Sequence, residues 1–538
     1  MSFSIPLLAS PSSQLEIRHP CRVQRRAVPY GTTMLRALAS GIIAVSVALV
    51  GFDCSEAAAQ CGMIEAQKLV ALDGELRHRF GNAVAMQDDL AVVGAHRDDL
   101  PGPSAGSAYV FRNELLSWVQ VQKLVANDAA AEDEFGTAVA IDGNVIVVGA
   151  PLDDNARGLD AGAAYVYRFD GSHWIQEKKL LASNGNDEDW FGWSVAVSGN
   201  TILVGAPFGT GPLFNTGLAY VFRYAGGSWV EEQILDPTSA GGEYRFGFSV
   251  ALAGGIAAVG APSDQMIGAV YTFHDTGTEW ELAARLVVAG GQIDDELGAA
   301  VALDDTTLLA GAPGQDGAAA GSGAGHLFRF DGTNWLYVQK LAPPGTQAGD
   351  RVGAAVALEG PIAVLGAPEA DRGAADTGAA FVYQQSGPNW VLKSGLVMSD
   401  AAREDLLGQG VATNGFEVLC GAPWDDPQGN LSGSACLFLA VQELVLEIDP
   451  VTIDPWDTMT VSTFYGPPGN PVLLTIMKVN GVPVFVPVVL AEFDANSRWV
   501  TAVLIRPGFS GLTVDAVTFA LQYCGGAQMS NVVTVSFN

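Results

Sequence analysis

Aspartate and glutamate are the residues of this sequence whose types and spacing could do chemistry. They occur in pairs and short runs, and several pairs follow a Gly-Ala or Gly-Ala-Pro segment. Clustered carboxylate oxygens suit a hard cation such as Ca²⁺, the one cofactor that the sequence suggests. The pairs that follow these segments are the candidate metal ligands: Asp98, Asp99, Asp153, Asp154, Asp425 and Asp426.

A second set of acids lies in polar runs that each precede a Phe-Gly or Leu-Gly dipeptide. These acids are the candidate ligand face: Glu132, Asp133, Glu134, Asp187, Glu188, Asp189, Asp294 and Asp295. Like charges at close range repel, so a bound cation, a cationic ligand or raised carboxylate pKa values would each relieve the repulsion. The alternative is that exposed loops are simply acidic and solvated, which keeps a large protein in solution.

The overall charge restricts the classes of partner. Lys and Arg number 27 against 58 Asp and Glu, which gives a formal net charge of −31. Such a surface repels nucleic acids and anionic membranes, so we expect neither as a partner. Histidine is scarce and never at metal-ligand spacing on one element, and no nucleophile elbow or glycine-rich phosphate loop is present. We therefore expect no enzyme activity.

A repeat defines the elements that must position the acids. Seven times, a glycine after Phe, Leu or Val is followed by Gly-Ala 13 residues later, as at Gly136 and Gly149. The glycine pairs are Gly81 and Gly94, Gly136 and Gly149, Gly192 and Gly205, Gly247 and Gly260, Gly298 and Gly311, Gly353 and Gly366, and Gly408 and Gly421. Between them lie two short apolar runs joined by a tight turn such as Asp142-Gly143, which predicts a β-hairpin.

Two further strands complete each unit. One is an alternating run opened by a glycine, and the next is a run led by tryptophan, such as the one from Trp174. The opening glycines are expected at Gly106, Gly162, Gly217, Gly268, Gly325, Gly378 and Gly433. Four strands at a period of 51 to 56 residues predict an all-β fold, a seven-bladed β-propeller over residues 61–440.

The last unit lacks its tryptophan-led strand. The run Gln67–Ala71 repeats the run Gln122–Ala126, so we expect the N-terminal segment to complete blade seven and to remove its open edge. In the same blade Cys420 and Cys436 come close in simple hairpin register. The residues leave a disulfide and two buried thiols equally open.

Both sets of acids are expected on one side of the ring. In a four-stranded meander, the turn after the second strand and the connection after the fourth emerge at the same end of the blade. A large share of the carboxylates should therefore crowd one face of the propeller, and that face is the candidate site.

The two ends of the chain differ from the repeats. Residues 1–60 combine several arginines, an apolar stretch over 41–52 and small residues before Gln60, the pattern of a secretory signal, with Met34 as an alternative start. No segment is long enough for a transmembrane anchor.

Residues 441–538 predict a small β-sandwich, an Ig-like accessory domain of seven strands. The strands are expected at Leu444–Ile448, Thr458–Phe464, Val472–Val479, Val484–Leu490, Trp499–Ile505, Thr513–Leu521 and Val532–Phe537. Cys524 of this part is either free, paired with Cys61 or linked to another chain.

The repeat resembles that of the FG-GAP family, whose best-known members form the seven-bladed head of integrin α chains, and is especially similar to secreted bacterial proteins built of such repeats. The resemblance covers roughly Gln67 to Ala440 and implies adhesion or ligand recognition at the cell surface, with an extracellular protein or glycan as partner. Integrin-type repeats insert a calcium loop between the two glycines. Here only a tight turn fits, so that site is not implied.

Two other functions stay open. A polysaccharide hydrolase or lyase would need paired carboxylates in an acidic cleft of the propeller, and nothing in the sequence singles out such a pair. A purely structural surface protein would need no ligand at all.

Overall fold

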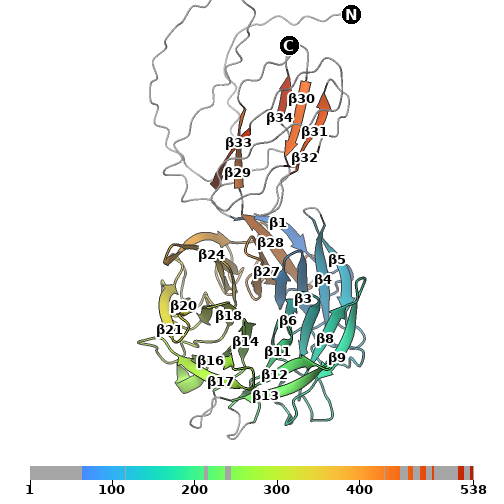
Figure 1. Cartoon of the computed structure of the whole chain (residues 1–538), viewed down its shortest axis with the longest axis vertical. Helices are drawn as coiled ribbons and strands as arrows, with labels where there is room; N and C mark the ends of the chain where they lie inside the picture. The colour runs from blue at the N-terminus through green and yellow to red at the C-terminus, as the bar shows by residue number, and fades with distance from the viewer. Residues whose placement is uncertain are drawn as a thin grey trace, which may run out of the picture. The chain divides into compact units, whose positions relative to one another are not determined.

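The computed structural model describes residues 63–440, apart from 115–116, 211–215, 237–243 and 429–430, and the backbone of six strands between residues 442 and 536. Over residues 63–440 the chain forms the predicted seven-bladed β-propeller, in which every blade is a four-stranded antiparallel sheet. Figure 1 shows the blades in a ring, with first strands such as β6 and β14 toward the middle and fourth strands such as β9 and β17 at the rim.

Blades one to three follow each other along the chain. They are β2 (Val84–Gln87), β3 (Leu90–Ala95), β4 (Ser107–Glu114) and β5 (Ser117–Leu124), then β6 (Ala138–Asp142), β7 (Val145–Ala150), β8 (Ala163–Phe169) and β9 (Trp174–Leu180), then β10 (Ser194–Ser198), β11 (Thr201–Ala206), β12 (Leu218–Ala225) and β13 (Ser228–Leu235).

Blades four to seven continue the series. They are β14 (Ser249–Ala253), β15 (Ile256–Ala261), β16 (Ala269–Asp275) and β17 (Trp280–Leu286), then β18 (Val301–Asp304), β19 (Thr307–Ala312), β20 (Ala324–Phe330) and β21 (Trp335–Leu341), then β22 (Val356–Glu359), β23 (Ile362–Ala367), β24 (Ala379–Ser386) and β25 (Asn389–Leu396), and finally β26 (Val411–Thr413), β27 (Glu417–Ala422), β28 (Ser434–Ala440) and β1 (Met63–Leu69).

The position of a strand within its blade explains its composition. The second strand packs against a neighbouring blade on both faces, so β7 is a continuous apolar run whose six residues are all buried. The fourth strand has one face toward solvent, so buried and exposed residues mix along β9. Apolar clusters therefore form between adjacent blades, as where Val92 of blade one meets Ile146 and Tyr165 of blade two.

The repeat glycines allow adjacent blades to approach closely. A Cβ on Gly149 of blade two would lie 1.9 Å from the carbonyl oxygen of Gly192, the first glycine of blade three. Gly192 itself has a φ of +98°, a conformation that side chains disfavour. One predicted glycine is wrong: the third strand of blade five is opened by Gly323, with a φ of +83°, whereas Gly325 lies inside β20 opposite Gly311. Gly323 and Gly325 are two residues apart and fall on the same face of an alternating strand, so the sequence pattern alone does not tell which of them opens it.

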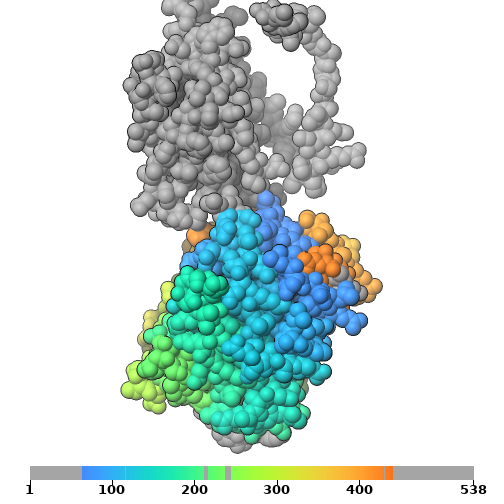
Figure 2. Space-filling model, turned by 90° about the vertical axis from the view of Figure 1, so that its right-hand side faces the viewer, coloured from blue at the N-terminus to red at the C-terminus, as the bar shows by residue number. Residues whose placement is uncertain are grey.

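The ring closes as predicted. β1 pairs with β28 in antiparallel register, and Figure 2 shows the first described residues (blue) beside the last blade (orange). The closing strand also reaches blade one, because the Gln67 side chain donates to the Trp118 carbonyl at 2.8 Å and accepts from the Trp118 amide at 2.9 Å. The same exchange joins Gln122 to Trp174, so the closure repeats an ordinary contact between blades.

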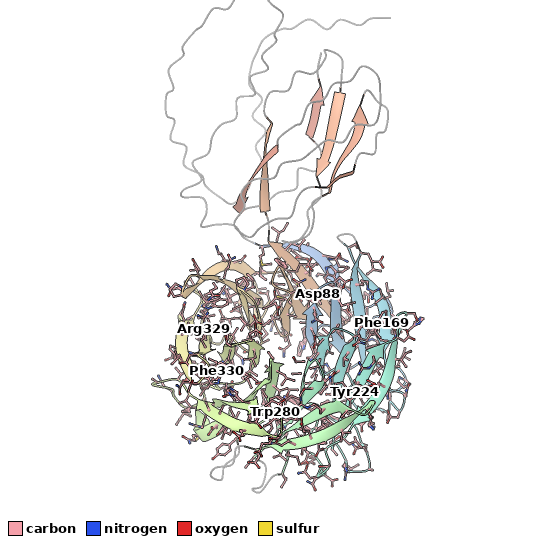
Figure 3. All side chains as sticks on the ribbon, in the orientation of Figure 1. Asp88, Phe169, Tyr224, Trp280, Arg329 and Phe330 are labelled. Atoms are coloured by element: carbon pink, nitrogen blue, oxygen red, sulfur yellow. The ribbon has the colours of Figure 1, made fainter. Side chains whose placement is uncertain are left out.

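Stacked cations and rings tie neighbouring blades together away from the acidic loops. Arg168 of blade two lies 4.6 Å from the ring centre of Tyr224 in blade three, and Arg223 lies 6.0 Å from Trp280 in blade four. Figure 3 labels Phe169, Tyr224 and Trp280, which lie on successive blades. Each such contact adds roughly 0.5–1 kcal/mol at an exposed site.

The C-terminal part contributes strands in two sheets. β29 (Gln442–Ile448) pairs with β33 (Phe519–Gly525), and the second sheet runs β32 (Pro487–Val489), β31 (Leu473–Val479), β30 (Thr458–Thr463) and β34 (Val533–Ser536). These strands overlap six of the seven predicted ones, while the predicted run Trp499–Ile505 lies outside the described residues. The packing expected of a sandwich stays a prediction.

The predicted export segment and Cys61 also lie outside the described residues. Within the part of the chain that the structure describes, no helix has the length and apolarity needed to cross a membrane.

Candidate functional site

The loops that carry the acids share one face of the propeller. The connection from blade one to blade two hydrogen-bonds the loop after β3: the Glu132 amide donates to the Pro103 carbonyl at 2.8 Å and the Glu134 amide to the Ser104 carbonyl at 3.1 Å. Similar contacts recur between later blades. The prediction that both loop classes emerge on the same side is confirmed, and we call this side the loop face.

The first acid of each pair is buried in an ion pair with lysine. Asp98, Asp153 and Asp425 are 0%, 2% and 8% exposed. Their carboxylates lie 2.6 Å from Lys123, 2.8 Å from Lys179 and 2.8 Å from Lys68, respectively. Each lysine comes from the fourth strand of the same blade. The structure thus places an ammonium group where the sequence analysis predicts a metal ion.

Hydroxyl groups add to these ion pairs. The Tyr165 hydroxyl donates to Asp153 at 2.6 Å, and Asp98 accepts from Ser107 at 2.7 Å and from Tyr109 at 2.8 Å. Although burial opposes the charged carboxylate, hydrogen bonds from Lys123 and the two hydroxyls hold the pKa of Asp98 below its usual value. The carboxylates are satisfied by the fold itself.

The second acid of each pair holds its own loop together. The Asp99 carboxylate accepts the Ser104 amide at 2.9 Å and Asp154 accepts the Asp160 amide at 2.9 Å. Asp426 accepts the Leu431 amide in the same way. The residue after the ion-paired acid therefore closes the turn that follows the second strand.

The acids between the blades divide into a buried and an exposed group. The buried ones each accept the backbone amide three residues earlier: Asp133 from Ala130 at 2.7 Å, Asp189 from Asn186 at 2.8 Å and Asp295 from Gln292 at 2.9 Å. Burial raises the pKa of Asp133 to about 6, and it raises that of Asp189. These aspartates are structural.

The acids on either side of the buried ones take a different conformation. Glu132, Glu188 and Asp294 are exposed and have left-handed φ angles of +71°, +63° and +68°. Glu134 pairs with Arg97 at 3.0 Å, and Asp187 accepts the Leu159 amide at 3.0 Å. The predicted ligand face is thus divided into ion pairs, loop contacts and scattered exposed acids. Among the described residues, no three His, Cys, Asp or Glu side chains converge as a metal site.

Two buried histidines on the loop face are parts of the fold. His78 occupies the position of the buried aspartate in blade one, and its Nδ1 accepts the Glu75 amide at 3.3 Å. His96, which replaces the proline of the first Gly-Ala-Pro, is buried, and burial together with Arg79 and Arg97 lowers its pKa to about 3.

Cys420 and Cys436 are directly opposite each other in β27 and β28. Of the two alternatives left open by the sequence, the structure has the two buried free thiols. Burial raises the pKa of both, which makes them poor nucleophiles.

A cluster of aromatic residues on the loop face escaped the sequence analysis. We call Trp190, Trp193, Phe208 and Phe248, with Arg245, the aromatic patch. All four rings are partly exposed, and none belongs to an apolar core cluster of the described residues. The repeat puts them together, because each lies within three residues of a repeat glycine of blade three or four.

The rings of the aromatic patch form one continuous surface. Trp190 and Trp193 are stacked at 5.4 Å, Trp190 meets Phe208 edge-on at 4.6 Å, and Trp193 lies 5.5 Å from Phe248. Arg245 lies 5.8 Å from the centre of the Phe208 ring. The four rings therefore contact one another in series, with Arg245 at the end that Phe208 forms.

The equivalent positions of other blades differ, and several of them carry charged side chains. Arg351 pairs with Glu296 at 2.9 Å and with Glu369 at 3.5 Å, and Arg79 lies 5.2 Å from the ring centre of Trp424. The residues beside the repeat glycines therefore vary from blade to blade while the glycines stay constant. Variation at fixed positions on a rigid scaffold is typical of a binding surface.

Comparison with known families gives one result. Seven segments match the family model described as FG-GAP repeat, and together they cover more than half of the chain. The segments are residues 64–111, 118–167, 174–222, 229–273, 280–328, 335–383 and 390–438. No curated protein matches the chain.

Proposed function

The chain belongs to the FG-GAP repeat family, and we propose that it is an exported binding protein that holds a glycan against the aromatic patch of its loop face. The scaffold is consistent with a binding or surface protein. The glycan, the location of the site and export are our proposals.

The aromatic patch is the observation that carries this proposal. Four neighbouring, partly exposed aromatic side chains lower the solubility of a protein. Contiguous exposed apolar groups of this kind commonly mark ligand grooves and protein contacts. Tryptophan and arginine dominate the energetics of binding surfaces because they combine a large apolar area with a polar group. The patch has both.

The geometry favours a sugar over a cation. An aromatic cage surrounds a cation with separated rings, whereas these rings contact each other, and Arg245 already lies beside Phe208. A pyranose has a flat face of C–H groups that can lie on an indole ring, and Arg245 is placed to donate hydrogen bonds to its hydroxyls. The partly exposed side chains of Trp190 and Trp193 would provide the platform.

We propose binding rather than catalysis because the candidate acids are engaged elsewhere. Asp98, Asp153 and Asp425 are tied to lysines, and Asp133 and Asp189 are tied to backbone amides. A glycosidase needs one free carboxylic acid and one carboxylate facing a common cleft. The proposal assigns calcium no role.

Export is supported by the first 60 residues, whose arginines, apolar stretch and small residues are typical of a secretory signal. The excess of Asp and Glu over Lys and Arg would keep the exported protein dispersed.

A glycan array with the exported full-length chain tests the proposal. We expect a defined set of neutral or weakly charged glycans to bind, and binding to be lost in the Trp190→Ala and Trp193→Ala variants. The control is Ile175→Ala, which removes an exposed apolar side chain from β9 outside the patch. An array without any bound glycan, or equal binding by all variants, would contradict it.

A further inference from the structure

Blade five departs from the other blades at the buried ion pair. Two sequence positions of each blade can be compared: the residue four positions after the second repeat glycine, and the second-last residue of the fourth strand. In most blades these two residues are either both charged or both uncharged. Blades one, two, four and seven have an acid with a base at these positions: Asp98 with Lys123, Asp153 with Lys179, Asp264 with Arg285 and Asp425 with Lys68. Blades three and six have neither, with Gly209 and Ile234, and Ala370 and Gly395. Blade five keeps the base, Lys340, but has Gln315 in place of the acid.

A second acid is missing from the same place. In blades one, two and seven the lysine also contacts an aspartate from the preceding connection: Lys123 lies 2.7 Å from Asp73, Lys179 2.7 Å from Asp128, and Lys68 2.7 Å from Asp400. The corresponding residue before blade five is Gly290. Lys340 has therefore lost both of the carboxylates that hold the equivalent lysines.

Lys340 is left with a weak set of partners. Its ammonium donates to the Asp316 carbonyl at 2.5 Å, and among the described residues it forms no ion pair. Although partial burial opposes it, the hydrogen bonds that Lys123 donates to Asp73 and Asp98 raise the pKa of Lys123, whereas partial burial lowers the pKa of Lys340. Lys340 is also exposed, whereas Lys68, Lys123 and Lys179 are half-buried.

The missing side chains leave a cavity. It has a volume of about 260 Å³ and is lined by Gly290 and Gln315, the two residues that replace the acids, and by His326, Tyr337 and Lys340. The acidic residues Asp295 and Asp316 also line it. The cavity therefore occupies the place where the other blades hold carboxylates, with a cation on its wall.

Neutral hydrogen bonds fix the wall opposite Lys340. The Gln315 amide donates to Asp295 at 3.1 Å, so its oxygen faces His326 and accepts from Nε2 at 2.7 Å. Nδ1 of His326 is then an acceptor for the Tyr337 hydroxyl at 3.3 Å. Burial and the charge of Lys340 lower the pKa of His326 to about 4, so Gln315, His326 and Tyr337 carry no charge at neutral pH. None of these three residues replaces the lost acids.

We propose that this cavity, which we call the blade-five pocket, binds a small carboxylate ligand whose oxygens take the place of the two missing aspartates on Lys340. The pocket lies on the rim of the loop face and shares no residue with the aromatic patch. The proposal therefore stands apart from the proposed glycan site and can succeed or fail without it.

The neighbouring acids do not exclude an anion. Asp295 already accepts from the Gln292 amide and from Gln315, and Asp316 accepts the Gly321 amide at 2.8 Å. Their equivalents in blade two, Asp133 and Asp154, coexist with two further carboxylates on Lys179. The fold thus accommodates an added carboxylate at this place.

Titration of the full chain with malonate, glucuronate and glucose at constant ionic strength tests the proposal. We expect malonate and glucuronate to bind and raise the melting midpoint, and glucose, the neutral match of glucuronate, to do neither. Lys340→Gln should weaken binding about tenfold or more, because it removes a charged hydrogen-bond donor. The matched control is Lys393→Gln, which removes the same charge from an exposed position on β25 and should leave binding unchanged.

A variant that restores the ion pair in blade five gives an independent test. Gln315→Asp restores the acid of the other blades, so the lysine should find an internal partner. This variant should lose binding of both carboxylates and melt at or above the wild-type temperature without ligand. Equal binding by Lys340→Gln, binding of glucose as tight as that of glucuronate, or undiminished binding by a folded Gln315→Asp variant would each overturn the proposal.

Discussion

At the scale of single residues, most of the acids serve the fold. Asp98, Asp153 and Asp425 neutralise lysines, and the acids that follow them close loops. The negative charge of the chain therefore does not by itself mark a ligand site. Residues that differ between equivalent positions, such as Trp190 and Gln315, carry more functional information than the acids that recur.

The ion pair of blade two gives a first prediction. Lys179→Met leaves Asp153 buried without its cation, and we expect a loss of about 2–3 kcal/mol in the free energy of unfolding, toward the low end for buried pairs because Lys179 is partly exposed. Denaturant unfolding measures the loss.

Blade three supplies the control for that prediction. It has Gly209 and Ile234 at these positions, so the fold tolerates the loss of both charges. The double variant Asp153→Gly with Lys179→Ile should recover part of the stability lost by Lys179→Met. If the single variant were as stable as the wild type, the pair would have no structural role.

The buried aspartates predict an unusual dependence of stability on pH. Burial raises the pKa of Asp133 and Asp405 to about 6, above the value near 4 expected in the unfolded chain. The folded state then binds protons more tightly than the unfolded state, so the stabilisation is present below pH 4 and is lost as the pH rises through 6. Each group should account for on the order of 2 kcal/mol.

Substitution of Asp133 or Asp405 by asparagine tests this pH dependence. Asp133→Asn and Asp405→Asn keep an oxygen that can accept the amide of Ala130 or Ala402 and remove the titration. The free energy of unfolding of each variant minus that of the wild type, measured in urea, should be more positive at pH 7.5 than at pH 4. A difference that stays constant between the two pH values would rule out the raised pKa values.

At the scale of elements, the closing strand is the least local part of the fold. β1 and β28 lie at opposite ends of the propeller sequence, and their pairing must be formed without a connecting turn. Gln67 extends the closure to blade one through its two hydrogen bonds to Trp118.

This closure predicts a matched pair of substitutions. Gln67→Ala and Gln122→Ala each remove two hydrogen bonds between blades, and each should cost about 1–3 kcal/mol. The two variants should have similar melting temperatures, because closed rings have no end at which one contact matters less. A neutral Gln67→Ala beside a destabilised Gln122→Ala would mean that β1 is frayed in solution.

The strands and their order could be predicted from the sequence because the repeat imposes them. The interval between Gly136 and Gly149, the turn at Asp142-Gly143 and the repetition of Gln67–Ala71 fixed the hairpins, the blade number and the closure. The opening glycine of blade five was misplaced because Gly323 and Gly325 share one alternation pattern, and only the bridge to Val352 distinguishes them.

The site was harder to predict, since it depends on contacts between blades. The lysines that pair with Asp98 and Asp153 lie some 25 residues further along the chain, on another strand. The aromatic patch joins Trp190 to Phe208 and Phe248 across two blades, and no single segment contains a motif for it. Aligning the seven repeats position by position would have revealed the odd residues, Trp193 and Gln315 among them.

At the scale of the whole molecule, the propeller is a closed ring whose loop face varies from blade to blade. Apolar clusters between all neighbouring blades hold the ring, and loops with different side chains emerge on one side. Such a division allows binding residues to change without cost to the fold. We therefore place both proposed sites on the loop face, one on the aromatic patch and one in the blade-five pocket.

The central claim is that the aromatic patch binds the ligand. The most direct test is the dissociation constant of the best glycan from the array, measured by calorimetry for the wild type and for the double variant Trp190→Ala with Trp193→Ala. Stacking of a ligand on exposed rings is worth about 1–3 kcal/mol per ring by analogy with base stacking, so we predict affinity at least tenfold weaker at an unchanged melting temperature. The same dissociation constant in both proteins would contradict the account.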